Sequence, residues 1–246
     1  VTDLLTADYS FLNERLAKHY GIAHVYGSHF RRVSLAGTER RGLLGQGGIL
    51  TLTSYATRTS PVLRGKWILE NLLSSPPPPP PPDIPALDET SEEGVALSMR
   101  AAMEQHRANP ACASCHSQMD PLGFALENFD ATGQWRTKYR VKKPHNGTFQ
   151  FRLEGYYHLG GEVDASGEIA THKFDDVFGL KKILLSDHRK VAYNFTKKFF
   201  EYANGYKPDL KERLYLFDLI PGNAKECRIK DLITKVLIYS LREGEE

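Results

Sequence analysis

The chain has 246 residues, of which 41% are hydrophobic and 25% are charged, a composition typical of globular proteins long enough to bury a real core. Lysine and arginine number 32 against 30 acidic residues, giving a formal charge of +2. Proteins that neutralise phosphates usually carry a clear basic excess, so this balance argues against nucleic-acid binding. No stretch approaches the roughly 18 uninterrupted apolar residues of a membrane helix, so no transmembrane segment is predicted.

The N-terminal part has a helical pattern. Residues 1–20 lack the apolar core of a signal peptide, yet the chain begins with Val1 rather than methionine. We therefore expect a processed product or one segment of a longer precursor. Asp8 or Ser10 is placed to cap a helix that Gly21 ends. The apolar residues at helical spacing between them are Phe11, Leu12, Leu16 and Tyr20.

A run of seven prolines at 76–82 marks the clearest boundary in the chain. Before it, residues 42–54 predict a short helix or turn, and Ser60-Pro61 opens a firmer helix with proline at its first position. Proline fixes φ and lacks an N–H donor, so the run predicts an extended polyproline II segment. We expect a surface spacer, with binding to a proline-recognition groove as the alternative.

The region after the prolines changes character twice. A helix is predicted from Ser91 to His106 or Arg107, ended by Asn109-Pro110. Residues 123–136 have the pattern of a helix and turn. Aromatic and β-branched residues mixed with glycines over 137–170 predict a small β-sheet or ribbon. Helical patterns then return at about 174–186, 187–204, 209–220 and 228–242.

The segment Cys112-Ala113-Ser114-Cys115-His116 is a complete C-x-x-C-H motif. Two thiols three residues apart fall on one side of a helical turn, at the separation of the two haem vinyl groups, and the adjacent histidine directs its imidazole at the iron. The motif predicts one covalently attached haem c. Cys112 and Cys115 are its attachment points and His116 is its proximal iron ligand.

Two other readings of the cysteine pair carry less weight. Zinc would need further ligands, and the chain has no second C-x-x-C, although His106 and Cys227 are available. A thioredoxin-type pair should follow a strand, whereas this pair follows a predicted helix and an Asn-Pro break. Cys227, the remaining cysteine, is expected to be a free thiol without a role.

The residues around the motif predict the rest of the haem pocket. Pro121 and Phe124 lie in an apolar segment that fits a pocket wall, and Pro121 or a neighbour is expected to offer a carbonyl to the outer nitrogen of His116. His106 is the first candidate for the distal iron ligand, because the Asn-Pro turn can fold its helix back over the haem. Met119 is a poor candidate because it lies on the same side of the ring as His116. The other distal candidates are Met99, Met103, His158 and His172.

The residues from His106 to His116, followed by Met119 to Asp130, resemble the haem segment of the planctomycete-type multidomain c-type cytochromes. The resemblance continues upstream in Leu12–Ala17 and Thr59–Trp67, and downstream in Val163–Gly167 and around Phe200–Gly205. It implies that this chain is similar to the C-terminal portion of such proteins, and that it is periplasmic or otherwise exported across the inner membrane. The resemblance carries over the haem ligands but no enzymatic activity.

Together these observations predict a mainly α fold: a cytochrome c-like helical haem domain with a small β insertion and a C-terminal helical region. The predicted division begins with an N-terminal helical segment (1–75), expected to be the end of a larger upstream domain, and a polyproline linker (76–88). A haem c-binding segment (89–140) follows, and then a β region with C-terminal helices completing the haem domain (141–246).

For function we favour electron transfer within a larger periplasmic redox assembly. The expected partners are other redox proteins or subunits, including the upstream part of its own precursor. The first alternative is a haem enzyme of the peroxidase or oxidase type with an open distal site, where His106 or Arg107 would act as acid–base group. A further alternative, compatible with electron transfer, is an assembly subunit that docks a partner through its proline run and β region.

Overall fold

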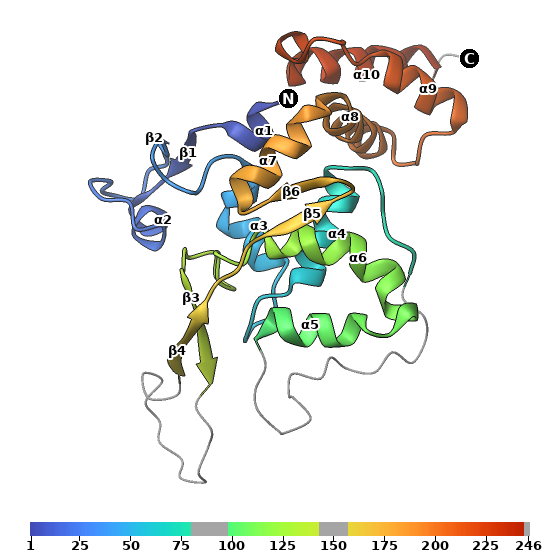
Figure 1. Cartoon of the computed structure of the whole chain (residues 1–246). Coiled ribbons are helices and arrows are strands. Elements are labelled where there is room, and N and C mark those ends of the chain that lie inside the picture. The colour runs from blue at the N-terminus through green and yellow to red at the C-terminus, as the bar shows by residue number, and fades with distance from the viewer. Residues whose placement is uncertain (80–97, 143–156, 244–246) are drawn as a thin grey trace.

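The structure, a computed structural model, describes residues 1–79, 98–142 and 157–243 (Figure 1). The helices of these residues are α1 (Asp3–Thr6), α2 (Glu14–His19), α3 (Gly47–Leu52), α4 (Pro61–Asn71), α5 (Met99–Arg107), α6 (Pro110–Phe124), α7 (Val177–Ser186), α8 (His188–Asn204), α9 (Leu210–Asp218) and α10 (Ile229–Glu243), with short 3-10 turns η1 (Leu43–Gly45) and η3 (Ala224–Glu226). The strands are β1 (Tyr9–Leu12), β2 (Arg31–Ser34), β3 (Lys138–Lys142), β4 (Tyr157–Glu162), β5 (Gly167–Ile169) and β6 (His172–Phe174).

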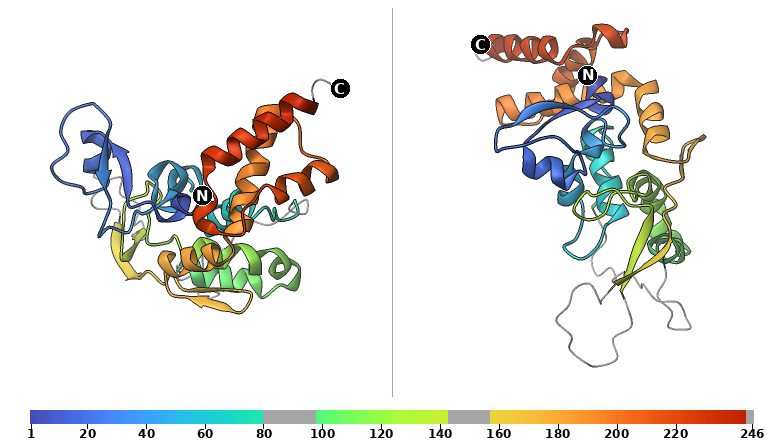
Figure 2. Two further views of the ribbon diagram at one scale, coloured as in Figure 1. Left: turned by 90° about the horizontal axis from the view of Figure 1, so that it is seen from above. Right: turned by 90° about the vertical axis from the view of Figure 1, so that its left-hand side faces the viewer.

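The prediction of a mainly α fold with a small β insertion is confirmed. The described strands form separate two-stranded antiparallel sheets, β1 with β2, β3 with β4, and β5 with β6. Helices α8, α9 and α10 gather at one end of the molecule beside the N-terminus, and the β3–β4 ribbon projects at the opposite end (Figure 1, Figure 2). Helices α4 and α6 lie between these ends, and α5 lies beneath α6 at the level of the ribbon (Figure 1).

The four C-terminal helices agree with prediction because strong local signals define them. Asp176 caps α7 through its side chain, so α7 begins at Val177, three residues later than the periodicity indicates. Asp209 forms a reciprocal capping box with Glu212 at the start of α9. Gly205 has a φ of 75° and ends α8 in the left-handed conformation.

The predicted N-terminal helix is only partly correct. Phe11 and Leu12 lie in β1, where Phe11 pairs with Arg32 and Leu12 with Arg31. The helix α2 begins later, capped by the side chain of Asn13. The spacing of apolar residues alone could not distinguish a helix from a strand here. The pairing partner β2 lies some twenty residues further along the chain and is mostly polar.

The middle of the chain agrees with prediction over most of the described residues. The helix and turn predicted over 123–136 is wrong in its helical part, because α6 ends at Phe124 and residues 125–136 form turns. Residues 42–54 form η1 and α3, and Ser60 caps α4 with Pro61 at its first position. Ser98 caps α5, while most of the predicted start of that helix, like prolines 80–82, lies outside the described residues. Residues 76–79 form no helix or strand.

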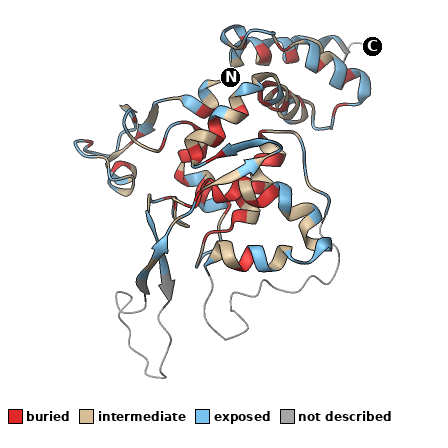
Figure 3. Ribbon diagram, viewed as in Figure 1, coloured by how far each residue is buried: buried red, intermediate tan, exposed pale blue. Residues whose placement is uncertain are grey.

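A single hydrophobic cluster joins the segments on both sides of the proline run. It contains Leu50 and Ile68 before the run, Leu122 and Phe129 after the cysteine motif, and Leu180 from α7. Buried residues concentrate in α4 and in the C-terminal half of α6, whereas α5 and the N-terminal half of α6 are more exposed (Figure 3). The cysteine motif therefore lies on a helix that is anchored at one end and accessible at the other.

Helices α4 and α6 approach each other so closely that each needs a glycine. A Cβ added to Gly65 of α4 would lie 1.9 Å from the carbonyl oxygen of Met119. A Cβ added to Gly123 of α6 would lie 1.8 Å from the carbonyl oxygen of Pro61. These reciprocal backbone contacts set the position of α6 against α4.

Gly123→Ala is accordingly expected to destabilise the protein by about 1–3 kcal/mol, the usual range for overpacking a core. Gly48→Ala is the matched control, because a Cβ on this glycine of α3 meets nothing within 4 Å. That change should be neutral or stabilising by about 0.4–1 kcal/mol. Denaturant unfolding of both variants measures the difference, and equal stabilities would refute the close crossing.

Candidate functional site

Helix α6 carries the cysteine motif on one face. Asn109 caps the helix through a 3.0 Å side-chain hydrogen bond, and Pro110 occupies its first position, so the helix starts immediately before the motif. Cys112 and Cys115 are free, half-buried thiols. With His116 they fall within about 100° of the helix circumference at 3.6 residues per turn. Two sulfur nucleophiles and an imidazole therefore share an accessible surface.

A buried carboxylate fixes the imidazole of His116. Its Nδ1 lies 2.9 Å from Oδ1 of Asp120, one helical turn further along α6. Asp120 is completely buried, so the contact is protected from water. The carboxylate can only accept, so Nδ1 carries the proton and Nε2 is the nitrogen left for a ligand.

In the described part of the chain, the second carboxylate oxygen of Asp120 lacks a hydrogen-bond donor. Its Oδ2 is buried and accepts no hydrogen bond within the described residues, while Nε of Arg107 lies 3.6 Å away. Arg107 ends α5 and its side chain is largely buried. The Asp120 charge is thus shared between an imidazole and a guanidinium that come from different helices.

Helix α5 folds back against α6, as the Asn-Pro turn predicts. The rings of His106 and His116 meet edge to face, with centroids 4.9 Å apart and planes at 76°. Burial lowers the pKa of His106 and the nearby His116 lowers it further, whereas Asp120 opposes the shift. The direct ring contact leaves no space for a metal between the two imidazoles, so ligation by both requires α5 to move outward.

The predicted pocket residues Pro121 and Phe124 lie beyond the C-terminal side of this cluster. They line an open hollow of 430 Å³ together with Arg100, Arg107 and Lys173. The guanidinium of Arg100 covers the Phe124 ring at 4.1 Å from its centroid. Arg107 borders both the hollow and the Asp120 carboxylate.

The prediction that a backbone carbonyl of Pro121 or a neighbour binds the outer nitrogen of His116 is wrong. The Pro121 carbonyl accepts the amide of Ala125 inside the helix, and the side chain of Asp120 contacts the imidazole instead. The sequence does contain a signal for this contact, because a histidine and an aspartate four residues apart on a helix are neighbours.

The other predicted distal candidates differ in their placement. Met103 and Met119 are buried, Met99 is half-buried, and His172 is exposed on β6. The side chain of His158 lies outside the described part of the chain. Of the described candidates, His106 lies with its ring against the imidazole of His116.

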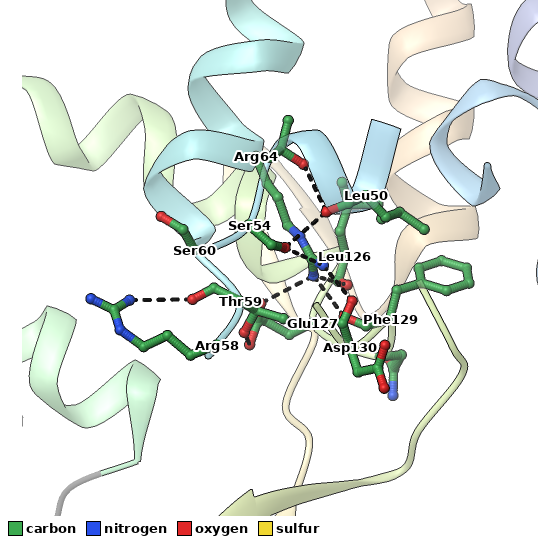
Figure 4. A network of polar contacts seen from close by, with 12 residues as sticks. Leu50, Ser54, Arg58, Thr59, Ser60, Arg64, Leu126, Glu127, Phe129 and Asp130 are labelled. Carbon is green, nitrogen blue, oxygen red and sulfur yellow. Dashed lines mark hydrogen bonds and ion pairs between the residues drawn. The ribbon is translucent and has the colours of Figure 1, made fainter. Parts of the chain in front are cut away.

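A buried polar network fixes the segment that follows α6 (Figure 4). Arg64 of α4 and Glu127 are both completely buried, and their side chains lie 3.2 Å apart. The Glu127 carboxylate also accepts from Thr59 at 2.9 Å and from Arg136 at 3.0 Å. The guanidinium of Arg64 donates in addition to the hydroxyl of Ser54 and to the carbonyls of Leu126, Phe129 and Asp130.

This network is structural, because its charged side chains pair with one another and with backbone carbonyls inside the core, although Nε of Arg64 makes no hydrogen bond within the described residues. Burial lowers the pKa of Arg64 to about 10 and Glu127 opposes that shift, so the guanidinium stays charged at neutral pH. Sequence reasoning did not identify it, although Arg64 and Glu127 both occur in the motifs that resemble the cytochrome family. Its effect is to hold the C-terminal end of α6 rigidly in the core.

The structure does not bring Cys227 to the cysteine pair. Cys227 packs with Ala192, Ile220 and Leu232 in a separate cluster between α8 and α10. Among the residues that the structure describes, no group of three or more histidine, cysteine, aspartate or glutamate side chains has the arrangement of a metal site. Within the same residues, no helix combines the length and apolarity that crossing a bilayer requires.

Comparison with known proteins gives one match. The model of the PSCyt3 family, described as a protein of unknown function (DUF1588), matches residues 40–139. That range contains α3 to α6 and therefore the cysteine motif, the glycine contacts and the Arg64 network. The family name agrees with the resemblance to planctomycete-type cytochromes, while its description assigns no function. No curated protein and no solved structure matches the chain.

Proposed function

We propose that the protein is a c-type cytochrome that transfers electrons through one covalently bound haem. The observation that carries the proposal is the arrangement on α6: Cys112, Cys115 and His116 share one face, and Asp120 binds Nδ1 of the histidine. Covalent haem attachment needs two accessible thiols and an imidazole with Nε2 directed outward. The two half-buried thiols support the proposal, as does the contact of Nδ1 with Asp120, which leaves Nε2 of His116 for the iron.

The chemistry of the residues fits haem c better than a free metal ion. Both thiols are free and half-buried, so they can form thioethers with vinyl groups. His116 is held in one tautomer by a buried carboxylate, which is the usual support of a metal-bound histidine. The haem would supply one-electron chemistry at its iron, while the protein tethers it, orients the proximal ligand and excludes water from Asp120.

His106 is the proposed distal ligand. It lies on the turn of α5 nearest His116, and its ring already contacts the proximal imidazole. Accommodating the haem requires α5 to move outward, and the nearby Asn109-Pro110 turn is a natural pivot for that movement. Two histidine ligands would give a low-spin iron suited to electron transfer.

The site also has features that suit a haem enzyme. Without His106 as a ligand, the iron would keep an open position with Arg107 and His106 as the nearest polar groups of α5. A carboxylate behind the proximal histidine increases its basicity, which also favours chemistry at the iron. The distal ligand therefore separates the two functions.

Location and partners follow from the same proposal. Haem c is attached after export, so the chain would act in the periplasm, as the resemblance to the planctomycete-type cytochromes also implies. Its partners would be other redox proteins or domains, including the upstream part of its precursor.

The optical spectrum of the holoprotein tests the proposal. The protein is produced in a periplasm with a c-type maturation system, and covalent haem is detected on a denaturing gel. We expect a low-spin spectrum that carbon monoxide does not change, and a carbon monoxide adduct in His106→Ala, because that variant opens the sixth position. A high-spin wild-type spectrum that responds to carbon monoxide would favour the haem enzyme. An absence of covalent haem would refute both.

A further inference from the structure

We propose that Asp120 is a positioning residue that lowers the reduction potential of the iron, with Arg107 acting against it. This inference rests on the proposed haem, and it identifies which charges of the protein would set the reduction potential of the haem iron. The charges that carry it come from α6 and α5, so the potential would depend on how the two helices pack.

The geometry connects Asp120 to the proximal ligand with little freedom. Asp120 follows His116 by one turn of the same helix, and the 2.9 Å contact joins its Oδ1 to Nδ1. The close crossing of α4 and α6 at Met119 and Gly123 fixes the helix on both sides of Asp120. The carboxylate therefore cannot move away from the imidazole without disturbing the core.

The carboxylate keeps much of its charge available to the iron. It is completely buried, its Oδ2 accepts no hydrogen bond within the described residues, and its nearest cation is Arg107 at 3.6 Å. A buried charge is weakly screened. Negative charge behind the proximal imidazole stabilises the ferric more than the ferrous iron, because the oxidised form carries the greater positive charge.

Arg107 should have the opposite effect. Its guanidinium lies beside the same carboxylate oxygen and also borders the hollow formed by Pro121 and Phe124. When α5 moves outward to admit the haem, the long side chain of Arg107 can keep this contact, because the residue lies next to the Asn109-Pro110 pivot. Removing this cation leaves Asp120 uncompensated, so the imidazole becomes more electron-rich and the ferric iron more stable. The two single variants are therefore predicted to shift the potential in opposite directions.

A mediated redox titration of the holoprotein tests these signs. Asp120→Asn should favour reduction by about tenfold or more, an upward shift of about 59 mV for one electron. Arg107→Gln should shift the midpoint downward. Asp164→Asn is the control, because it also removes one negative charge but lies half exposed beside Arg100 at the other end of α5, and its shift should be smaller.

The outcomes separate this inference from the proposed function. If the wild-type chain carries covalent haem and the Asp120 and Arg107 variants leave its potential unchanged, the inference is wrong and the cytochrome stands. If no haem is attached, both are wrong. Shifts of the same sign in both variants would indicate general damage to the site and would also overturn the inference. If Asp120→Asn fails to fold, the downward shift in Arg107→Gln decides.

Discussion

Replacing both Cys112 and Cys115 with alanine is expected to abolish covalent haem attachment completely. The two thiols are free, and they lie on the accessible half of α6. The double variant should therefore give no haem stain on a denaturing gel. The single variant Cys112→Ala retains one sulfur, so any haem it holds would carry one thioether and an unreacted vinyl group. The absorption maximum of the pyridine haemochrome distinguishes these two attachments.

Cys227→Ala is the matched control for this loss. Cys227 is a buried thiol that packs between α8 and α10, away from the cysteine pair. Its replacement should leave the haem stain and the haemochrome maximum unchanged, although it removes packing from the core. Full two-thioether attachment in Cys112→Ala would overturn the assignment of the motif. Loss of haem in Cys227→Ala would show instead that attachment depends on general stability.

The structure adds to the cysteine motif the contacts that other parts of the chain make with it. The cysteine pair, the histidine and the Asn109-Pro110 cap are local features, so sequence alone predicts their arrangement on a helix. The partner of His116 also follows from local spacing, since Asp120 is one turn away, but an apolar reading of that segment obscures it. Arg107 was not foreseeable as the second partner, because its position depends on how α5 packs against α6.

The same distinction applies to the fold. Helices α7 to α10 are long, periodic and capped, so local signals define them, and their boundaries were predicted within a few residues. The strand β1 was missed because Phe11 and Leu12 fit a helical pattern as well as a strand, and only the pairing with Arg31–Ser34 decides between them. Short elements whose stability comes from distant partners leave no distinct local pattern.

Tertiary contacts also explain the motifs before the proline run. Within Ser60–Trp67, Ser60 caps α4, Arg64 enters the buried network, and Gly65 lets α6 approach. Each of these residues serves the position of α6, which carries the cysteine motif. The segment before the proline run and the cysteine motif therefore belong to one structural unit around α6.

Arg64→Ala is expected to destabilise the protein by about 3–5 kcal/mol, the cost of removing one partner from a buried ion pair. The change leaves the Glu127 carboxylate with Thr59 and Arg136 as partners, and it leaves buried carbonyls without their donor. Denaturant unfolding measures the loss. Lys66→Ala is the control on the same helix, since its pair with Glu70 is only partly buried and should contribute below about 1 kcal/mol.

Arg64→Lys separates the charge of Arg64 from its hydrogen-bonding geometry. Lysine would keep the positive charge beside Glu127, but a single ammonium cannot reproduce the fork of donors. Arg64 reaches the carbonyls of Leu126, Phe129 and Asp130 at 2.7–2.9 Å with two nitrogens. We therefore expect Arg64→Lys to lose most of the stability that Arg64→Ala loses. If Arg64→Lys were as stable as the wild type, charge pairing alone would account for the network, and the carbonyl contacts would contribute nothing measurable to holding the end of α6.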